Sequence, residues 1–232
     1  MKMTSLNNNK VKYAAKLFKS SKFRTEENKF LVYGEHLVQE ALNKNLVEQI
    51  FHIEEIKYVG IEVSQEVIKK ILGGINANIC AVCFKEEKDF EDGHVLILDY
   101  IQDPGNLGTI IRSAKAFDFK NILISKDSVD LYNEKVLRAT QGAFFNMNIK
   151  QGDIKEYLSS SNNLLVTTYL NEENEEIDLN QSLDLIFGNE GNGLKEDFKQ
   201  MKHVNTKVET SFDSLNVGVA ASIIIHNISK GK

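Results

Sequence analysis

The sequence contains only two cysteines, Cys80 and Cys83, which form a single C-x-x-C pair in 232 residues. Such a pair is compatible with a redox site or with half of a zinc site. No second Cys/His pair is placed to complete a zinc site, and the surrounding stretch NICAVCF is typical of a strand with small buried residues. Because free cysteine behaves as a small hydrophobic side chain, we favour two buried thiols and expect no metal.

Long apolar runs and export signals are also lacking. No uncharged apolar run reaches the roughly 18 residues of a membrane span. The N-terminus is polar and rich in lysine and asparagine, without a signal-peptide pattern. We therefore expect a cytoplasmic protein with no membrane partner. The length and a hydrophobic content of 42% suit one large or two small globular domains.

Two common nucleotide-binding signatures are absent as well. The sequence has no G-K-[ST], which a phosphate-cradling P-loop requires, and no G-x-G-x-x-G dinucleotide fingerprint. Residues 186–194, IFGNEGNGL, instead place three glycines in the spacing G-x-x-G-x-G after an apolar run. A strand, a glycine loop and a short helix in this order suggest a nucleotide-like ligand at the carboxyl end of a sheet. Glycines at a tight turn without a ligand are an equally good explanation.

Negative charge prevails in the chain, and its formal net charge of −5 argues weakly against a nucleic-acid partner. Residues 1–30, however, carry eight Lys/Arg and two Asp/Glu, so this end has a net charge of +6 and the remainder −11. The stretch KVKYAAKLFKSS, from residue 10, predicts a helix with Val11, Ala14, Ala15 and Phe18 on one face. Its lysines lie mostly elsewhere, which predicts a basic surface.

Strands and helices alternate along the chain, a pattern that favours a mostly parallel α/β sheet. The charged stretch 85–93 reads as a linker, so we predict domains at 1–88 and 89–232. In the second domain, HVLILDY is continuous and apolar, as a fully buried parallel strand should be. We predict a helix from about Asn106 to Phe117, a strand at FFNMNI (144–149), an acidic surface loop at 171–178 and a last helix from near Ser214.

Three blocks stand in a fixed order: LDYIQDPGNLGTIIRSAKAF (98–117), IFGNEGNGL (186–194) and SLNVGVAASIII (214–225). In order and spacing they resemble the three signature motifs of the SpoU/TrmH family, which belongs to the SPOUT superfamily of RNA methyltransferases. The block LYNEKVLRATQGAFF (131–145) is also similar to the family's. The start of the chain resembles the substrate-binding domain that precedes many members. One departure is Thr206-Lys207-Val208, where members usually carry an Ile-Pro-Met-like stretch.

This resemblance implies a fold, a cofactor and partners. The expected fold is a C-terminal SPOUT domain with a mostly parallel sheet and a deep trefoil knot, preceded by a small α/β RNA-binding domain. The expected reaction is methyl transfer from S-adenosylmethionine to a ribose 2′-hydroxyl, with ribosomal RNA favoured over transfer RNA. The family also forms homodimers. The apolar character of the last helix on nearly all sides supports this, because such a helix must be covered.

The resemblance also assigns roles to single residues, which compete with simpler explanations. Asn106 sits where a helix N-cap would, Ser214 could cap the last helix, and Arg138 could be a surface charge. Because a guanidinium stays protonated near neutrality, we expect Arg112 to bind a phosphate and stabilise the emerging alkoxide. The implied catalytic residues are Asn106, Arg112, Glu190, Ser214 and Asn216. The implied cofactor-binding residues are Gly188, Asn189, Gly193, Thr206 and Leu215. The expected RNA contacts are Lys10, Lys12, Lys16, Lys19, Lys22, Arg24 and Arg138.

Three other functions remain open at this point. Some SPOUT relatives methylate base nitrogens instead of ribose. A relative altered at residues 206–211 could bind RNA without catalysis, although the retained motif residues argue against this. An oxidoreductase with a nucleotide cofactor is disfavoured by the glycine spacing.

Overall fold

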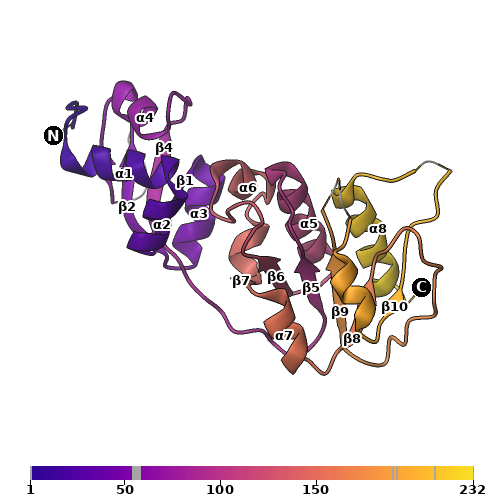
Figure 1. The fold of residues 1–232 in the computed structure, drawn as a ribbon. Coiled ribbons are helices and arrows are strands. Elements are labelled where there is room, and N and C mark those ends of the chain that lie inside the picture. Colours follow the sequence, from indigo (N-terminus) through magenta and orange to yellow (C-terminus); the bar gives the residue numbers. More distant parts are fainter. Residues whose placement is uncertain (1, 54–58, 190, 192, 212, 232) are drawn as a thin grey trace. The chain divides into compact units, whose positions relative to one another are not determined.

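The computed structural model describes residues 2–53, 59–189, 191, 193–211 and 213–231. The chain divides into two compact units, whose helices and strands are labelled in Figure 1. Unit 1 consists of Met1–Glu86 and Asp130–Phe145, and unit 2 of Glu87–Val129 and Asn146–Lys232. Unit 1 therefore includes a segment from the second half of the chain, residues 130–145. The two units thus differ from the contiguous stretches 1–88 and 89–232. As functional modules, those two stretches stay a prediction.

Unit 1 is built around a four-stranded mixed sheet in the order β1-β4-β2-β3. β4 pairs antiparallel with both β1 and β2, and β3 is parallel to β2. The strands are β1 (Lys29–Tyr33), β2 (Val47–His52), β3 (Ile61–Glu62) and β4 (Ile79–Phe84), and the helices are α1 (Asn9–Lys19), α2 (Ser21–Glu27), α3 (Glu35–Asn43), α4 (Gln65–Ile71) and α6 (Glu134–Ala139).

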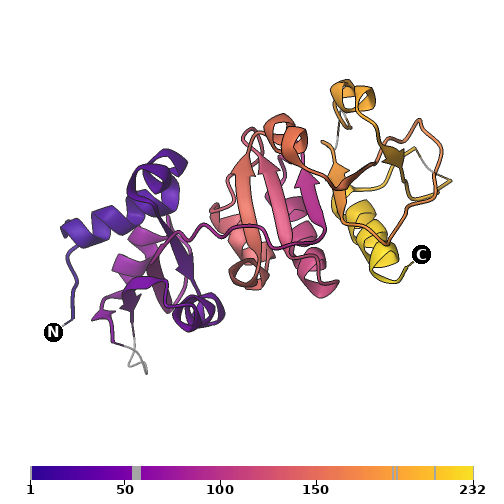
Figure 2. The same cartoon turned by 90° about the horizontal axis from the view of Figure 1, so that it is seen from below.

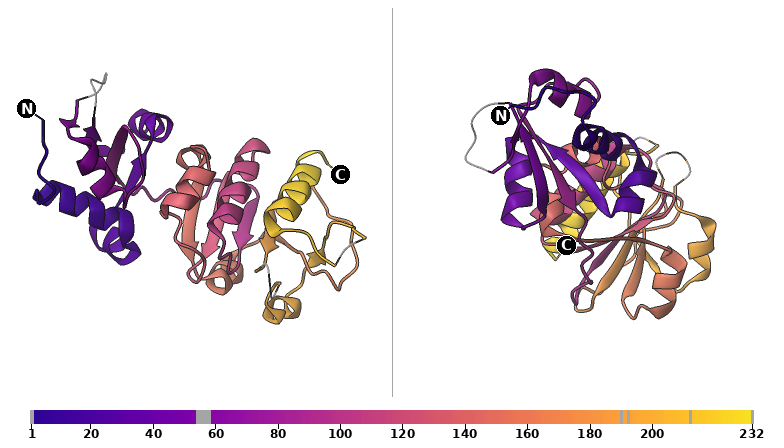
Figure 3. Two further views of the ribbon diagram at one scale, coloured as in Figure 1. Left: turned by 90° about the horizontal axis from the view of Figure 1, so that it is seen from above. Right: turned by 90° about the vertical axis from the view of Figure 1, so that its left-hand side faces the viewer.

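Helices cover both faces of this sheet, with α1 and α4 on one side and α3 on the other (Figure 3). The predicted apolar face of α1 is confirmed: Val11 and Ala14 are fully buried, Ala15 is buried, and Phe18 packs against the same cluster. Burying such faces removes apolar surface from water, which is the main favourable contribution to folding.

The two cysteines lie in the central strand β4 and point to opposite faces, since Cys80 belongs to the cluster under α1 and Cys83 to the cluster under α3. Both are free and buried, so the prediction of buried thiols is confirmed. Burial raises the pKa of both thiols, which keeps them protonated and unreactive.

Unit 2 contains a six-stranded sheet in the order β10-β8-β9-β5-β6-β7, and all its pairings are parallel. The predicted α/β class with a parallel sheet is thus confirmed. Figure 2 shows α5 and α8 on one face of the sheet and α7 with η2 on the other. The strands are β5 (Val95–Leu98), β6 (Asn121–Ser125), β7 (Asn148–Gly152), β8 (Leu164–Thr167), β9 (Leu183–Phe187) and β10 (Val204–Asn205), and the helices are α5 (Pro104–Ala116), α7 (Ile154–Ser160), the 3₁₀ turn η2 (Glu196–Gln200) and α8 (Val217–Ser229).

Some predicted boundaries were wrong. FFNMNI is not one strand, because Ala143–Asn146 form the 3₁₀ turn η1 and β7 begins only at Asn148. Phe145 is drawn into the apolar core of unit 1, which overrides the extended conformation that its sequence favours. Within the described part of the chain, no helix is long and apolar enough to cross a membrane.

The chain path of unit 2 brings its C-terminal half back onto its first helix. The residues described between β10 and α8 form no helix or strand. α8 packs against α5 and hydrogen-bonds to it through Ser113 and Ser222, 2.7 Å apart at their Oγ atoms. The trefoil knot implied by the family resemblance stays a prediction.

Candidate active site

The glycine loop that follows β9 is closed by its own backbone. Asn189 and Gly193 exchange two backbone hydrogen bonds, with N–O distances of 3.1 and 2.9 Å. The Asn189 side chain accepts a bond from the Gly191 N–H (2.8 Å) and donates one to the Tyr100 carbonyl (3.0 Å). Asn189 therefore ties the loop to the segment that follows β5.

Gly188 lies against the backbone of its own loop. A Cβ atom on Gly188 would lie 2.3 Å from the carbonyl carbon of Gly193 and 2.4 Å from the nitrogen of Leu194. The close neighbour of Gly188 is therefore the returning strand of its own loop. Gly193 has a different need: its φ of +67° lies in the left-handed region, which favours glycine, although the space around it is open.

A cavity of about 260 Å³ opens beside this loop. It lies at the carboxyl ends of β8 and β9, where parallel α/β sheets bind their ligands. The residues that line it come from the end of β8, the glycine loop, the connection 207–215 and the start of α8. They include Thr168, Leu170, Gly188, Asn189, Gly193, Lys207, Val208, Thr210, Ser214, Leu215, Val217 and Ile224.

Four of the five expected cofactor residues line this cavity, and Thr206 does not. Gly188, Asn189, Gly193 and Leu215 are among the lining residues. Thr206 instead continues the β10 ladder, with its N–H donating to the Thr167 carbonyl at 2.9 Å, and borders a separate cavity of about 530 Å³. The following Lys207 and Val208 border both cavities.

Asn106 and Asn216 meet between the first turns of α5 and α8. The Nδ2 of Asn216 donates to the Oδ1 of Asn106 at 2.9 Å. Asn106 is not the N-cap of α5; that position belongs to Asp103, whose side chain accepts from the Asn106 N–H. Asn216, expected inside α8, is its N-cap and accepts from the N–H groups of Gly218 and Val219. Ser214 accordingly does not cap the helix, and it lines the cavity.

Arg112 is exposed on α5, nearly two turns beyond Asn106. Glu190 lies outside the described residues. The structure therefore brings Asn106, Asn216 and Ser214 to the cavity side of α5 and α8, and it places Arg112 further along the same helix.

The expected RNA contacts divide into two groups. Lys10, Lys12, Lys16 and Lys19 are exposed on α1, and Lys22 is exposed on α2. Arg24 is a correction because it is 4% exposed. Its guanidinium donates to the carbonyls of Leu17 and Phe18 and forms an ion pair with Asp130, so it staples α1 to the segment 130–145.

Arg138 is exposed on α6 and donates a hydrogen bond of 3.0 Å to the Tyr33 hydroxyl. It borders a cavity of about 520 Å³ within unit 1, together with His36, Asn76 and Asn78. These side chains supply both hydrogen-bond donors and acceptors.

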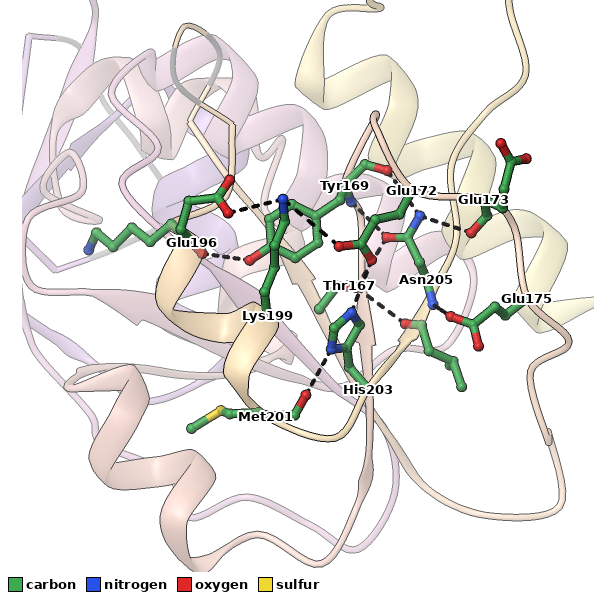
Figure 4. A network of polar contacts seen from close by, with 12 residues as sticks. Thr167, Tyr169, Glu172, Glu173, Glu175, Glu196, Lys199, Met201, His203 and Asn205 are labelled. Carbon is green, nitrogen blue, oxygen red and sulfur yellow. Dashed lines mark hydrogen bonds and ion pairs between the residues drawn. The ribbon is translucent and has the colours of Figure 1, made fainter.

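Two features of unit 2 were missed from the sequence. Asp99, which directly follows β5 and is 1% exposed, forms an ion pair of 3.0 Å with Lys195. An acidic residue directly after a buried strand is a signal that could have predicted a buried carboxylate with a basic partner. The second feature is a polar network centred on Asn205, for which the sequence carries no signal (Figure 4). Among the described residues, no group of three or more His, Cys, Asp or Glu side chains could hold a metal ion.

The fold and the cavity define unit 2 as a parallel α/β ligand-binding domain. Residues 93–226 match the family model described as the SpoU rRNA Methylase family, and residues 8–73 match the MRM3-like substrate binding domain. The chain belongs to the SpoU rRNA methylase family, which confirms the resemblance of the three motifs.

Relatives agree over nearly the full length. The 23S rRNA (guanosine(2553)-2′-O)-methyltransferase RlmP of Bacillus subtilis is 33% identical over 242 residues, covering 97% of both chains. A crystal structure of an rRNA methyltransferase from Sinorhizobium meliloti matches with a TM-score of 0.89 and 25% identity, covering 100% of this chain and 98% of that one. Its AdoMet-bound form matches with a TM-score of 0.87 and 24% identity over the same shares.

Proposed function

We propose that this protein transfers a methyl group from S-adenosylmethionine to a ribose 2′-hydroxyl of ribosomal RNA. The observation that carries the proposal is the cavity formed jointly by the second and third motifs, next to the Asn106–Asn216 hydrogen bond that joins the first motif to the third. The B. subtilis relative is named as a 23S rRNA 2′-O-methyltransferase, and its similarity to this protein extends over 97% of both chains.

The residues of the cavity fit this cofactor. Gly188, Asn189 and Gly193 line the cavity, and the open space around Gly193 leaves its backbone accessible for hydrogen bonds to an adenosine. Leu215, Val217 and Ile224 offer apolar contacts on the opposite wall. S-adenosylmethionine supplies an electrophilic methyl group on a sulfonium, and the protein must align the acceptor oxygen with it.

The motif residues on α5 and α8 are placed to orient the acceptor. Asn106 and Asn216 hold each other in one arrangement, so that their remaining polar atoms can orient the ribose. Ser214 lines the cavity and offers a further hydrogen bond. Arg112 pairs with the neighbouring backbone phosphate and stabilises the alkoxide that forms as the hydroxyl loses its proton. The expected role of Glu190 stays a prediction.

The proposed RNA surface is the lysine face of α1 and α2, with Arg138 as a separate contact. Lys10, Lys12, Lys16, Lys19 and Lys22 are exposed, and phosphate contacts of this kind supply sequence-independent affinity. The substrate is ribosomal RNA, and the nucleotide equivalent to that named for the B. subtilis relative is the first candidate. We therefore propose a cytoplasmic location for the protein.

A homodimer through α8 completes the proposal. Val219 and Ile223 on α8 are 48% and 37% exposed, and their spacing of four residues places them on one side of the helix. Leu215, just before the helix, is 36% exposed. The single chain thus leaves one apolar side of α8 uncovered, as the sequence led us to expect. Light scattering at micromolar concentration should give the dimer mass, and Val219→Lys with Ile223→Lys should give the monomer.

The acceptor atom is tested with substrate RNA that carries a single 2′-deoxy nucleotide at the target. The ribose assignment predicts no methylation at that nucleotide, while the matched unmodified RNA is methylated. Methylation of the deoxy substrate would favour a base-methylating relative. RNA binding without any methylation of either RNA would favour a non-catalytic relative.

A further inference from the structure

The described residues of the cavity wall 207–215 belong to no helix or strand, since β10 ends at Asn205 and α8 begins at Val217. The chain's one proline is Pro104, so no proline stiffens this wall. Val208 and Thr210 nevertheless line the cavity and must hold their positions to fit a ligand. Their positions therefore depend on contacts with neighbouring segments.

Asn174 makes two of these contacts with one side chain. Its Oδ1 accepts a hydrogen bond from the backbone N–H of Lys207 at 2.7 Å. Its Nδ2 donates to the Oε1 of Glu209 at 2.8 Å. Asn174 thus bridges the two neighbours of Val208, which lies between them on the cavity wall. The loop 171–178, expected to be only an acidic surface loop, touches the wall through this bridge.

The loop that carries Asn174 is itself anchored. Asn205 is fully buried, and its side chain bonds to the Tyr169 N–H (2.8 Å), the Tyr169 carbonyl (2.9 Å) and the Glu173 carbonyl (3.3 Å). Its backbone exchanges two further bonds with Glu175, one to the Glu175 N–H and one to the Glu175 side chain (Figure 4). Buried amide networks with all partners present are rigid. The backbone of the loop around Asn174 is consequently held in place.

A second anchor lies at the start of the same loop. Glu172 accepts a hydrogen bond of 3.0 Å from the Nε2 of His203 and lies 3.9 Å from the Lys199 ammonium (Figure 4). The loop is therefore held at Glu172, Glu173 and Glu175, on both sides of Asn174.

We propose that Asn174, outside the three motifs, is a positioning residue for the cofactor cavity: by bridging Lys207 and Glu209 it fixes Val208 against the bound ligand. The identity of that ligand, S-adenosylmethionine, rests on the proposed function. Asn174 does not line the cavity itself, so it acts only through the wall.

The test exchanges donor and acceptor across the bridge. Asn174→Asp keeps the acceptor for the Lys207 N–H but places a carboxylate against Glu209. Loss of one hydrogen bond and the added repulsion should weaken S-adenosylmethionine binding about five- to tenfold by calorimetry. Adding Glu209→Gln lets residue 209 donate to the new carboxylate and should restore the affinity to within about twofold. At saturating cofactor, kcat should stay near the wild-type value while KM for the cofactor rises.

A control variant and a hydrogen-exchange measurement test the Asn174 bridge separately from the proposed function. Asn180→Ala is the matched control, because the exposed Asn180 side chain hydrogen-bonds to Asp178 and not to the wall 207–215. This variant should leave the affinity unchanged. Hydrogen exchange of residues 205–211 without ligand should accelerate in Asn174→Asp and not in the control. Wild-type affinity and wild-type exchange in Asn174→Asp would overturn the bridge. A wild-type protein that binds no S-adenosylmethionine would refute the cofactor assignment independently of the variants.

Discussion

The side-chain amide of Asn216 caps α8 and at the same time donates a 2.9 Å hydrogen bond to the side chain of Asn106 on α5. One residue thus has a structural task, with its oxygen, and a proposed functional task, with its nitrogen. The two atoms can be separated by substitution.

Asn216→Asp should keep the cap and lose the donor. Aspartate caps helices as well as asparagine and interacts favourably with the helix N-terminus, so the melting temperature should not fall. Methyl transfer should fall at least tenfold, on the order of 1.4 kcal/mol in the barrier, because Asn106 loses its fixed orientation. Asn216→Ala should lose about 1 kcal/mol of stability in addition. Equal melting temperatures with unchanged turnover in Asn216→Asp would remove Asn216 from the active site.

Gly188 and Gly193 should respond differently to alanine. Gly188→Ala forces a Cβ into the Gly193–Leu194 backbone, so the loop must open and cofactor binding should be lost. Gly193→Ala meets open space and should cost only the strain of a left-handed residue, about 1–2 kcal/mol. Calorimetric titration of both variants with S-adenosylmethionine measures the difference, and similar affinities for the two would contradict the steric explanation.

Arg24→Ala should destabilise unit 1 by about 3–5 kcal/mol, because it leaves Asp130 without its buried partner. Burial opposes ionisation of Asp130, but the Arg24 guanidinium outweighs it and holds the pKa of Asp130 below its ordinary value of 3.8. The stabilisation is therefore present at neutral pH and lost as the pH falls below 3.8. Urea unfolding at neutral and acidic pH measures the free energy of unfolding of both proteins. The difference between wild type and Arg24→Ala should be smaller in acid. Lys22→Ala, an exposed neighbour, should change stability by less than about 0.5 kcal/mol.

The His203–Glu172 pair predicts a decline of stability above neutrality. Burial lowers the pKa of His203, but hydrogen bonds to the Met201 carbonyl and Glu172 outweigh this and raise it above 6.5. A raised histidine pKa stabilises the folded state fully at pH values below the ordinary pKa of 6.5. This stabilisation is lost as the pH rises through the pKa of His203 in the folded state. The melting temperature should fall from about pH 6 to about pH 8, and His203→Gln should reduce that fall. His226→Gln, on α8, should keep the wild-type pH dependence.

Lysines of α1 should carry salt-dependent RNA affinity. Lys16→Ala with Lys19→Ala should weaken binding and lower the magnitude of the log-affinity versus log-salt slope by roughly 0.7–0.9 per lost phosphate contact. Lys69→Ala with Lys70→Ala removes the same charge from the exposed side of α4 and serves as the control. Equal slopes in both double variants would show that the α1 lysines are merely solvated.

The sequence by itself determined the class of the protein and most of its elements. Apolar runs such as VLIL and NILI required buried parallel strands, and the spacing of Val11, Ala14 and Ala15 required a covered helix face. These patterns depend on the spacing of apolar residues along the chain, which can be read from the sequence without the tertiary structure. The three motifs likewise named Gly188, Leu215, Ser214 and Asn216, and the structure brings them to the cavity or its edge.

Tertiary structure alone decided which side chains meet across long separations. Arg24 looks like a surface charge in a basic segment, yet Asp130, 106 residues away, takes it into the interior. Thr206 still hydrogen-bonds to Thr167 beside β10, whereas Val208, two residues on, reaches the cavity beside the glycine loop. Asn174 and Asn205 belong to no motif, and their roles follow from contacts with segments that the fold brings beside them. Such pairings depend on the path of the whole chain, because hydrogen bonds of buried groups are satisfied by whichever partner lies near in space.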